Sequence, residues 1–383
     1  MSPLPAPQPD AARHSEALRA RILDEIAAAG GWLSFARFME LALYAPGQGY
    51  YSAGLRKFGT TGDFVTAPEI SPLFGRALAR QAAQVLQLSG GDLLEAGAGS
   101  GRLAADLLPE LERLGRLPAQ YLILEVSADL RERQRALLAE KIPHLAGRVR
   151  WLDELPPRFR GLVLGNEVLD AMPVHIVAWH EDGIYERGVA AGNGGFAWSE
   201  RKLTGGELYT AAAGLNLPAG YVSEINLASR AFVATLAGIL EQGAILMLDY
   251  GFGASEYYHP QRSEGTLMCH YRQHTHGDPF FLPGLQDITA HVDFSAVAAA
   301  GIENGLTLMG YTTQAHFLIN CGITEILAQT PAEDTGAYLP LAAQAQKLLS
   351  PAEMGELFKA IALGRGIAEP LIGFRVGDRS RML

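Results

Sequence analysis

The sequence is poor in cysteine, in long apolar runs and in positive charge. Two cysteines in 383 residues exclude a disulfide framework and suit a reducing compartment. No apolar run approaches the roughly 18 residues that span a bilayer, so we expect no membrane insertion. The formal net charge of -10 argues against nucleic acid as the main partner, because nucleic-acid binding depends on Lys and Arg.

The N-terminal residues 1–14 are rich in proline and have neither the apolar core of a secretory signal nor an Arg- and Ser-rich transit pattern. We expect them to be a disordered lead-in to a bacterial-type, cytoplasmic protein. The rest of the chain can bury a core, since 48% of the residues are hydrophobic. Its length fits one large domain with additions or two modest domains.

The most informative segment is residues 93–111, LLEAGAGSGRLAADLLPEL. Its pattern predicts a buried strand, a glycine turn and an amphipathic helix, with Gly97, Gly99 and Gly101 at alternate positions. Glycine has no Cβ and accepts positive φ, so a ligand can approach the backbone and meet the free N–H groups of a helix start. Such a turn is typical of the nucleotide pocket in a doubly wound α/β sheet.

The spacing of the glycines indicates which nucleotide binds. A dinucleotide fingerprint, G-x-G-x-x-G, would need a third glycine where this chain has Arg102. Residues 54–61 have the glycines of a phosphate-binding loop but lack its Lys. The observed G-x-G-x-G, with Glu95 two residues before it, looks like motif I of class I S-adenosylmethionine-dependent methyltransferases. A nicotinamide oxidoreductase is the alternative on the same fold.

Further apolar runs also end in polar residues. Glu125 closes the run 121–127 about 24 residues past the last glycine, near the spacing of a carboxylate that binds ribose hydroxyls. Asn166 and Glu167 close a third run, and Asp249 closes a fourth. Because ligands bind at the carboxyl ends of strands in open α/β sheets, we expect these side chains in one site. The Asn166 amide suits the cofactor or a substrate nitrogen.

The pattern of elements predicts an N-terminal helical extension and an inserted antiparallel β element. We expect a helix over 15–29, a second helix capped by Ser34, and an extended loop at Pro68 and Pro72. A hairpin is expected around 192–195, and the last strands are expected within 305–320 and 370–377. The predicted division is 1–14 lead-in; 15–80 helical and lid region; 81–180 first half of the core; 181–228 inserted element; 229–383 second half of the core with C-terminal helices and strands.

Five blocks together resemble the MidA family of class I methyltransferases, over roughly Ile26 to Phe317. They are residues 58–75, 93–108, 165–174, 246–252 and 265–297. The resemblance implies a Rossmann-like core that uses S-adenosyl-L-methionine. The family includes a mitochondrial complex I assembly factor that acts as a protein arginine methyltransferase, so it also implies a protein substrate with an arginine-containing segment, such as a respiratory complex subunit.

Arginine as the acceptor would need carboxylates to orient its permanently charged guanidinium. Glu167 and Asp170 stand at i and i+3 and would face one side if the segment turned helically. A polar strand end with one capping acid is the alternative. His291 and Asp293 would share a face of a strand, as an acid–base pair or as a structural hydrogen bond.

Asp63 and Glu69 lie in a segment that could close over the cofactor, or that could simply pack through its prolines and Phe64. We therefore group both acids with the predicted cofactor residues Glu95, Gly97, Gly99, Gly101, Glu125 and Asn166.

One further cluster of residues could instead indicate a metal site. Cys269, His270, His274 and His276 lie within eight residues. Arg272 and Gln273 interrupt the run and there is no second Cys pair, so we predict no metal.

The sequence thus predicts a methyltransferase acting on arginine of a protein. A small-molecule O- or N-methyltransferase and a cofactor-binding assembly chaperone with little turnover remain as alternatives. An oligomer is possible, and the sequence gives no oligomeric state.

Overall fold

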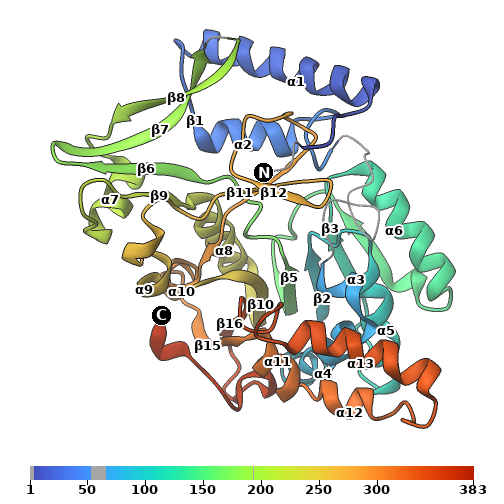
Figure 1. The fold of residues 1–383 in the computed structure, drawn as a ribbon. Helices are drawn as coiled ribbons and strands as arrows, with labels where there is room; N and C mark the ends of the chain where they lie inside the picture. Colours follow the sequence, from blue (N-terminus) through green and yellow to red (C-terminus); the bar gives the residue numbers. More distant parts are fainter. Residues whose placement is uncertain (1–3, 53–65, 193) are drawn as a thin grey trace. The chain divides into compact units, whose positions relative to one another are not determined.

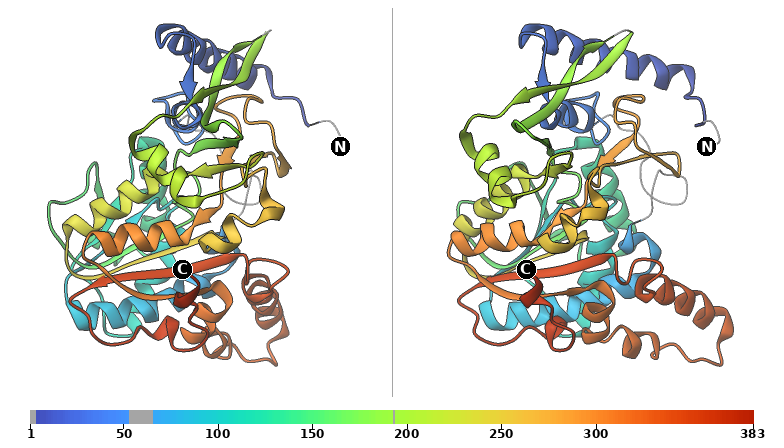
Figure 2. Two further views of the ribbon diagram at one scale, coloured as in Figure 1. Left: turned by 90° about the vertical axis from the view of Figure 1, so that its left-hand side faces the viewer. Right: turned by 60° about the vertical axis from the view of Figure 1, so that its left-hand side comes forward.

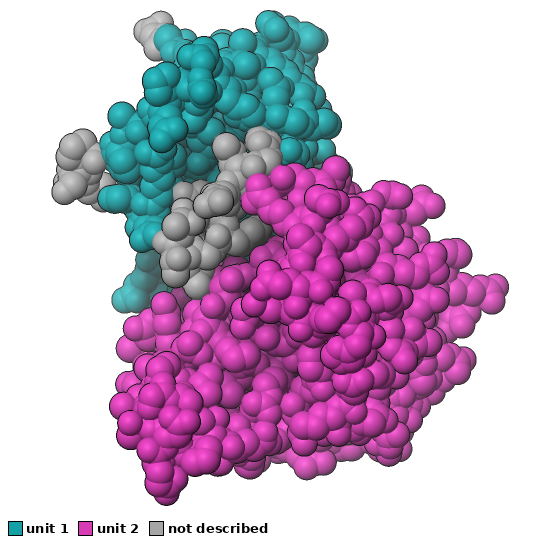
Figure 3. Space-filling view, turned by 90° about the vertical axis from the view of Figure 1, so that its right-hand side faces the viewer, with its two compact units in different colours: residues 1–64, 169–230, 254–293 teal, residues 65–168, 231–253, 294–383 magenta. Residues whose placement is uncertain are grey.

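The computed structural model describes residues 4–52, 66–192 and 194–383. The chain divides into two compact units, which Figure 3 colours separately. Unit 1 comprises Met1–Phe64, Leu169–Arg230 and Ala254–Asp293, and unit 2 comprises Val65–Val168, Ala231–Gly253 and Phe294–Leu383. Residues 254–293, which the sequence assigned to the second half of the core, therefore group with the N-terminal segment.

Unit 2 is built on a mixed sheet with the strand order β15-β16-β10-β5-β2-β3-β4 (Figure 1). Strands β10, β5, β2, β3 and β4 are parallel, and β16 runs antiparallel to both of its neighbours. The order reverses between β2 and β5, which is the topological switch point of a doubly wound sheet. The predicted fold class is thus confirmed. The bounds are β2 (Asp92–Ala96), β3 (Tyr121–Leu124), β4 (Val149–Leu152), β5 (Phe159–Asn166), β10 (Leu240–Phe252), β15 (Thr307–Thr313) and β16 (Phe358–Arg365).

The central strands of unit 2 are apolar on both faces because helices cover both. Leu162 and Leu164 of β5 join one core cluster, while Val163 between them points to the other face. Figure 2 shows α4 on one face of this sheet and α10 on the other. A parallel sheet that is buried in this way reads as a continuous hydrophobic run, which is why its strands were visible in the sequence.

The helices of unit 2 surround this sheet. They are α3 (Ala67–Ile70), α4 (Pro72–Ser89), α5 (Arg102–Arg113), α6 (Ala128–Lys141), α10 (Phe294–Glu303), α11 (Gln314–Asn320), α12 (Ile323–Leu327) and α13 (Thr335–Leu349), and α8 (Leu227–Ile239) spans the boundary with unit 1. The expected extended loop at Pro68 and Pro72 is wrong, since both prolines lie in the first turns of helices. Proline suits these positions because the N–H that it lacks would have no partner inside the helix.

Unit 1 contains two antiparallel sheets and the N-terminal helices. One sheet has the order β1-β7-β6-β9, with β8 beside β7, and the other has the order β12-β11-β13. The predicted hairpin is confirmed, because β7 and β8 pair from Tyr185–Lys202 to Gly192–Gly195. The bounds are α1 (Pro9–Ala28), β1 (Leu33–Ser34), α2 (Phe35–Tyr44), β6 (His175–His180), β7 (Gly183–Gly192), β8 (Gly195–Lys202), α7 (Gly206–Leu215), β9 (Val222–Ile225), α9 (Ala254–Tyr257), β11 (Met268–Tyr271), β12 (His274–His276), β13 (Asp287–Thr289) and β14 (Val292–Asp293).

Local signals decide how the helices of unit 1 begin. The Ser34 side chain accepts a hydrogen bond from the Arg37 N–H at 3.1 Å, which confirms the predicted cap of α2. Helix α1 begins at Pro9 rather than near Ser15, so the predicted disordered lead-in is helical over residues 9–14. Proline occupies the first helical position, and Asp10 adds a favourable negative charge to the first turn.

The last strand lies earlier than the sequence suggested. It is β16, whereas residues 370–377 contain only the short 3₁₀ turn Ile372–Phe374. In that turn the apolar side chains of Leu371 and Phe374 are buried at a spacing of three residues, which fits a helical turn and not an alternating strand.

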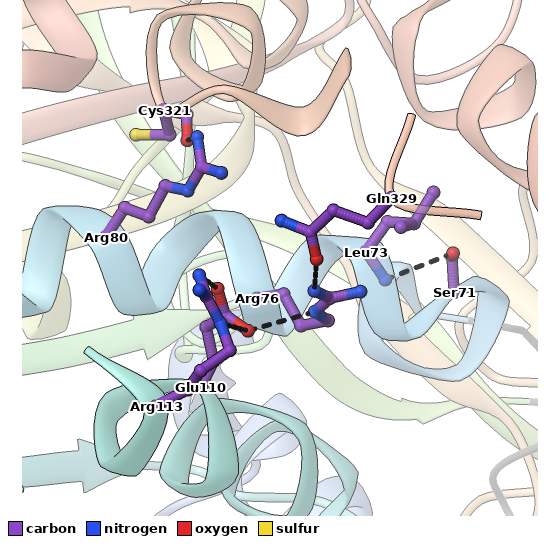
Figure 4. Close-up of polar contacts among 8 residues, drawn as sticks. All are labelled: Ser71, Leu73, Arg76, Arg80, Glu110, Arg113, Cys321 and Gln329. Atoms are coloured by element: carbon purple, nitrogen blue, oxygen red, sulfur yellow. Dashed lines mark hydrogen bonds and ion pairs between the residues drawn. The ribbon is translucent and has the colours of Figure 1, made fainter. Parts of the chain in front are cut away.

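A buried carboxylate ties together helices of unit 2 (Figure 4). Glu110 of α5 accepts hydrogen bonds from Arg76 Nε at 3.1 Å and from Arg113 Nη2 at 2.6 Å. Arg76 also donates to Gln329 at 2.5 Å, beyond the end of α12. Burial acts to raise the pKa of Glu110, but the hydrogen bonds from the two arginines outweigh it and lower the pKa.

We predict that Glu110→Gln lowers the free energy of unfolding by about 1–3 kcal/mol, because it weakens charge-assisted hydrogen bonds at a buried acceptor. Urea denaturation at pH 7 measures the effect. The matched control is Glu112→Gln on the same helix, where the carboxylate is 47% exposed and a change within about 0.5 kcal/mol is expected. Equal midpoint shifts for the two variants would contradict the prediction.

Candidate functional site

The glycine turn of unit 2 follows β2 and leads directly into α5. Gly97, Gly99 and Gly101 have φ values of 66°, 52° and 85°, in the left-handed region that favours glycine. Gly101 caps α5, and a Cβ there would lie 3.2 Å from Gln134 Cγ. A Cβ at Gly97 would lie 3.0 Å from the Val168 side chain. Positive φ and tight packing within the chain therefore favour glycine at these two positions, in addition to any approach of a ligand.

The acid before the turn is deeply buried. Glu95 is 3% exposed and accepts a hydrogen bond from the Tyr121 hydroxyl at 2.7 Å. Burial raises the pKa of Glu95 to about 7, with a further contribution from the Glu125 charge, although the Tyr121 hydrogen bond opposes the shift. Glu95 can thus gain or lose a proton near neutral pH.

The acid after β3 is held in a fixed position. Glu125 accepts hydrogen bonds from the Ser127 N–H at 2.9 Å and from Gln134 Nε2 at 3.3 Å. Gln134 also donates to the Gly99 carbonyl at 2.9 Å, which joins Glu125 to the glycine turn. The next residue, Val126, is 79% exposed, so an apolar side chain lies in solvent beside this carboxylate.

The segment after β5 forms a second polar turn in unit 2, beside the end of β10. Glu167 has φ of 53°, which is unusual for a residue other than glycine and is typical of functional turns. Its N–H donates to the Leu248 carbonyl at 2.9 Å, and the Val168 N–H donates to the buried Asp249 carboxylate at 3.1 Å. The helical turn that would have placed Glu167 and Asp170 on one side does not form, because Glu167 has a left-handed backbone and is hydrogen-bonded to β10.

Side chains of this turn contact the segment before α4. The Glu167 carboxylate accepts from the Ala67 N–H at 3.3 Å and from Asn166 Nδ2 at 3.1 Å. Glu69, which lies two residues after Ala67, accepts a hydrogen bond from the Ser100 hydroxyl in the glycine turn. Glu69 therefore adjoins the glycine turn, its predicted role toward the cofactor stays a prediction, and Asp63 lies outside the described residues.

Three predicted catalytic residues belong to unit 1. The boundary between the units falls between Val168 and Leu169, so it separates Asp170 from Glu167. The Asp170 side chain is buried, and its carbonyl accepts from the Ala290 N–H at 3.0 Å. The His291 N–H donates to Thr266 at 3.1 Å.

Asp293 interacts with Tyr258 within unit 1. Burial first, and then the charge and hydrogen bond of Asp293, raise the pKa of that tyrosine well above its ordinary value. The structure thus gives Asp293 a tyrosine partner that the sequence did not indicate.

The Cys/His run forms the β11–β12 hairpin. Cys269 pairs with His276 and Tyr271 pairs with His274, which leaves His270 on the opposite face of the ribbon. Burial raises the pKa of the Cys269 thiol. Within the described ranges, no three His, Cys, Asp or Glu side chains gather as metal ligands would.

Gln134, Ser100 and Val126 were missed by sequence reasoning. Ser100 could have been noticed inside the glycine turn, and Val126 beside a predicted ribose acid. Gln134 carries no local signal, since it lies in the middle of a polar helix, α6.

The polar groups of unit 2 fit S-adenosyl-L-methionine. Asn166 Oδ1 is buried and has no hydrogen-bond partner among the described residues, so it suits a donor such as an amino group of the cofactor. A carboxylate such as that of Glu125 can accept from two vicinal hydroxyls. Across the described part of the chain, no helix has the length and apolar character needed to cross a bilayer.

Two solved structures share this fold, and several curated proteins are similar in sequence. A crystal structure from Burkholderia thailandensis with S-adenosyl-homocysteine bound has 53% sequence identity over 100% of both chains, with a TM-score of 0.97. A native crystal structure from the same organism has 53% identity, full coverage and a TM-score of 0.94. Among curated proteins, the mouse protein arginine methyltransferase NDUFAF7, mitochondrial, is 28% identical over 87% of this chain and 81% of its own length. The Drosophila melanogaster homologue is 27% identical over 97% of this chain and 92% of its own length.

A family model described as "Putative S-adenosyl-L-methionine-dependent methyltransferase" matches residues 77–312. This match covers more than half of the chain and includes the glycine turn and all four polar strand ends. The chain therefore belongs to this family of S-adenosyl-L-methionine-dependent methyltransferases.

Proposed function

We propose that the chain transfers the methyl group of S-adenosyl-L-methionine to an arginine side chain of a protein. The proposed cofactor site rests on one observation: four neighbouring strands of unit 2 end in polar residues beside one glycine turn. The names of the curated relatives, which are protein arginine methyltransferases, support arginine as the acceptor.

The proposed cofactor contacts follow from the chemistry of each group. Glu125 accepts from the ribose hydroxyls, and the exposed Val126 side chain covers the apolar face of the adenine. The glycine turn and Glu95 face the methionine portion, with Asn166 and Glu69 completing the polar contacts. The bound cofactor supplies an electrophilic methyl group on a sulfonium, and the chain supplies its placement against the acceptor.

Glu167 is proposed to contact the substrate guanidinium. Its carboxylate lies at the end of β5, where a charge-assisted hydrogen bond would orient an arginine nitrogen. Asp170, His291 and Asp293 stay predictions for the catalytic step, and Asp63 stays a prediction for the cofactor.

The biological setting is also a proposal. The resemblance to the MidA family supports a link with respiratory complex assembly. The two buried free thiols, Cys269 and Cys321, fit a reducing cytoplasmic compartment.

Replacing Gly99 should remove cofactor binding. Gly99→Val introduces a β-branched side chain at φ of 52° in the turn, so we expect the Kd for S-adenosyl-homocysteine to rise at least tenfold in calorimetry. Gly115→Val is the matched control, because Gly115 has φ of 65° and a Cβ there meets nothing within 4 Å. Unchanged affinity in Gly99→Val, or tighter binding of NAD than of S-adenosyl-homocysteine by the parent protein, would contradict the proposed cofactor site.

Cofactor affinity should depend on pH through Glu95. A nearby ammonium group favours the ionised carboxylate, and with a pKa of about 7 in the free protein most Glu95 is protonated at pH 6. We therefore expect S-adenosyl-homocysteine to bind roughly tenfold more weakly at pH 6 than at pH 8. In Glu95→Gln, which cannot ionise at this position, the affinity measured by calorimetry should not change between these pH values. If the affinities of the parent protein and the variant changed with pH in the same way, a group other than Glu95 would be responsible.

Glu167→Gln should separate methyl transfer from cofactor binding. The variant keeps the size of the side chain and loses its charge, so arginine methylation should fall at least tenfold, while affinity for S-adenosyl-homocysteine should change by less than about threefold. Mass spectrometry of methylarginine measures this after incubation with an extract of cells that lack the protein. Full turnover by the variant would rule out the guanidinium role and favour a small-molecule acceptor. A parent protein that binds the cofactor but methylates nothing would favour the assembly-chaperone alternative.

A further inference from the structure

We propose that Gln134 is a positioning residue for recognition of the cofactor ribose, because its side-chain amide fixes the Glu125 carboxylate against the glycine turn. This inference rests on the proposed role of Glu125 in binding the ribose hydroxyls. Gln134 lies within α6, outside every motif that the sequence indicated, and its side chain is fully buried.

The amide of Gln134 joins three separate elements of unit 2. Its Nε2 donates to the Gly99 carbonyl at 2.9 Å and to Glu125 Oε2 at 3.3 Å. Its Oε1 accepts from Trp151 Nε1 of β4 at 2.7 Å. One planar group therefore links the turn after β2, the acid after β3 and the strand β4.

Trp151 determines which way the amide faces. The indole N–H of tryptophan can only donate, so it must meet the oxygen of the amide. The amide nitrogen, with its two hydrogens, is then turned toward the Gly99 carbonyl and the Glu125 carboxylate, which can only accept. The Arg135 guanidinium stacks on the indole, 4.7 Å from the ring centroid, and helps to hold Trp151 in place.

The packing at Gly101 explains why the amide can reach these partners. A Cβ at Gly101 would lie 3.2 Å from Gln134 Cγ and 3.4 Å from its Cα. The absence of that atom allows α6 to approach the turn closely, and the length of a glutamine side chain then spans the remaining distance.

Gln134 acts on the geometry of the Glu125 carboxylate and not through a contact of its own with the cofactor. Oε1 of Glu125 accepts a hydrogen bond from the Ser127 N–H, and Oε2 accepts one from Gln134 Nε2. Both carboxylate oxygens are therefore held by other groups of the chain. A fixed carboxylate presents its remaining acceptor directions at constant positions, which two vicinal hydroxyls require. Without Gln134, Oε2 of the carboxylate and the Gly99 carbonyl each lose this donor.

The test compares two ligands and a matched pair of variants. Calorimetry measures the Kd of S-adenosyl-homocysteine and of its analogue that lacks both ribose hydroxyls, for the parent protein, Gln134→Met and Gln81→Met. Gln81 is the control because it is also a buried glutamine, whose amide bonds the Gly373 N–H at 2.9 Å and Gln84 at 3.0 Å, away from the turn.

We expect Gln134→Met to raise the Kd of S-adenosyl-homocysteine at least tenfold and the Kd of the analogue without ribose hydroxyls less than threefold. Gln81→Met should change neither Kd. If Gln134→Met fails to fold, Trp151→Phe takes its place, because it removes the donor that orients the amide. Trp151→Phe should show the same selective loss of affinity for S-adenosyl-homocysteine, but a smaller one. An equal loss of affinity for both ligands in Gln134→Met, or no loss of affinity, overturns the inference.

The variant Glu125→Gln separates this inference from the proposed cofactor site. If Glu125→Gln binds both ligands as the parent does, the ribose assignment itself fails. If Glu125→Gln loses affinity selectively for S-adenosyl-homocysteine but Gln134→Met does not, only the positioning role of Gln134 fails.

Discussion

The register of the parallel strands in unit 2 is the constraint on which the rest of the candidate site depends. Ala96 at the end of β2 lies opposite Leu124 of β3 and Gly165 of β5, and Asn166 lies opposite Leu248 of β10. A shift of one residue would turn every side chain to the other face of the sheet, so that neither face would match the helices packed on it. Burial on both faces therefore fixes the register, and the register brings four polar strand ends to one edge.

Carboxylates gathered at that edge would be costly without hydrogen-bond donors. Glu125 and Asp249 each receive backbone N–H groups, whereas Glu95 accepts a hydrogen bond from a tyrosine hydroxyl and has a pKa of about 7. The edge thus combines fixed anions with one acid that can change its charge near neutral pH. A cofactor with hydroxyl groups and an ammonium group complements both kinds of acid.

Much of this arrangement could be predicted from the sequence, because apolar runs, glycine spacing and acids that close a strand are local patterns. The parallel strands and the glycine turn were accessible in this way. What could not be predicted depends on tertiary contacts. Gln134 has its partners 35, 9 and 17 residues away in the chain, so nothing near it marks its role. A helical turn at Glu167 was only a condition for a shared face with Asp170, because the sequence showed nothing beyond the spacing of the two acids.

The conformation of Glu167 explains why a helical turn does not form there and what the turn does instead. A left-handed backbone at a glutamate is unfavourable by itself and persists only when its surroundings hold it. Here the Leu248 carbonyl and the Asp249 carboxylate hold Glu167 and Val168 on β10, while the Glu167 carboxylate receives the Ala67 N–H. Ser100 binds Glu69 two residues later, so the short helix α3 is attached both to the glycine turn and to the end of β5. Glu167 therefore has a structural contact as well as its proposed role toward arginine. Since a glutamine at this position can still accept from Ala67, substitution by glutamine removes the charge while retaining an acceptor for α3.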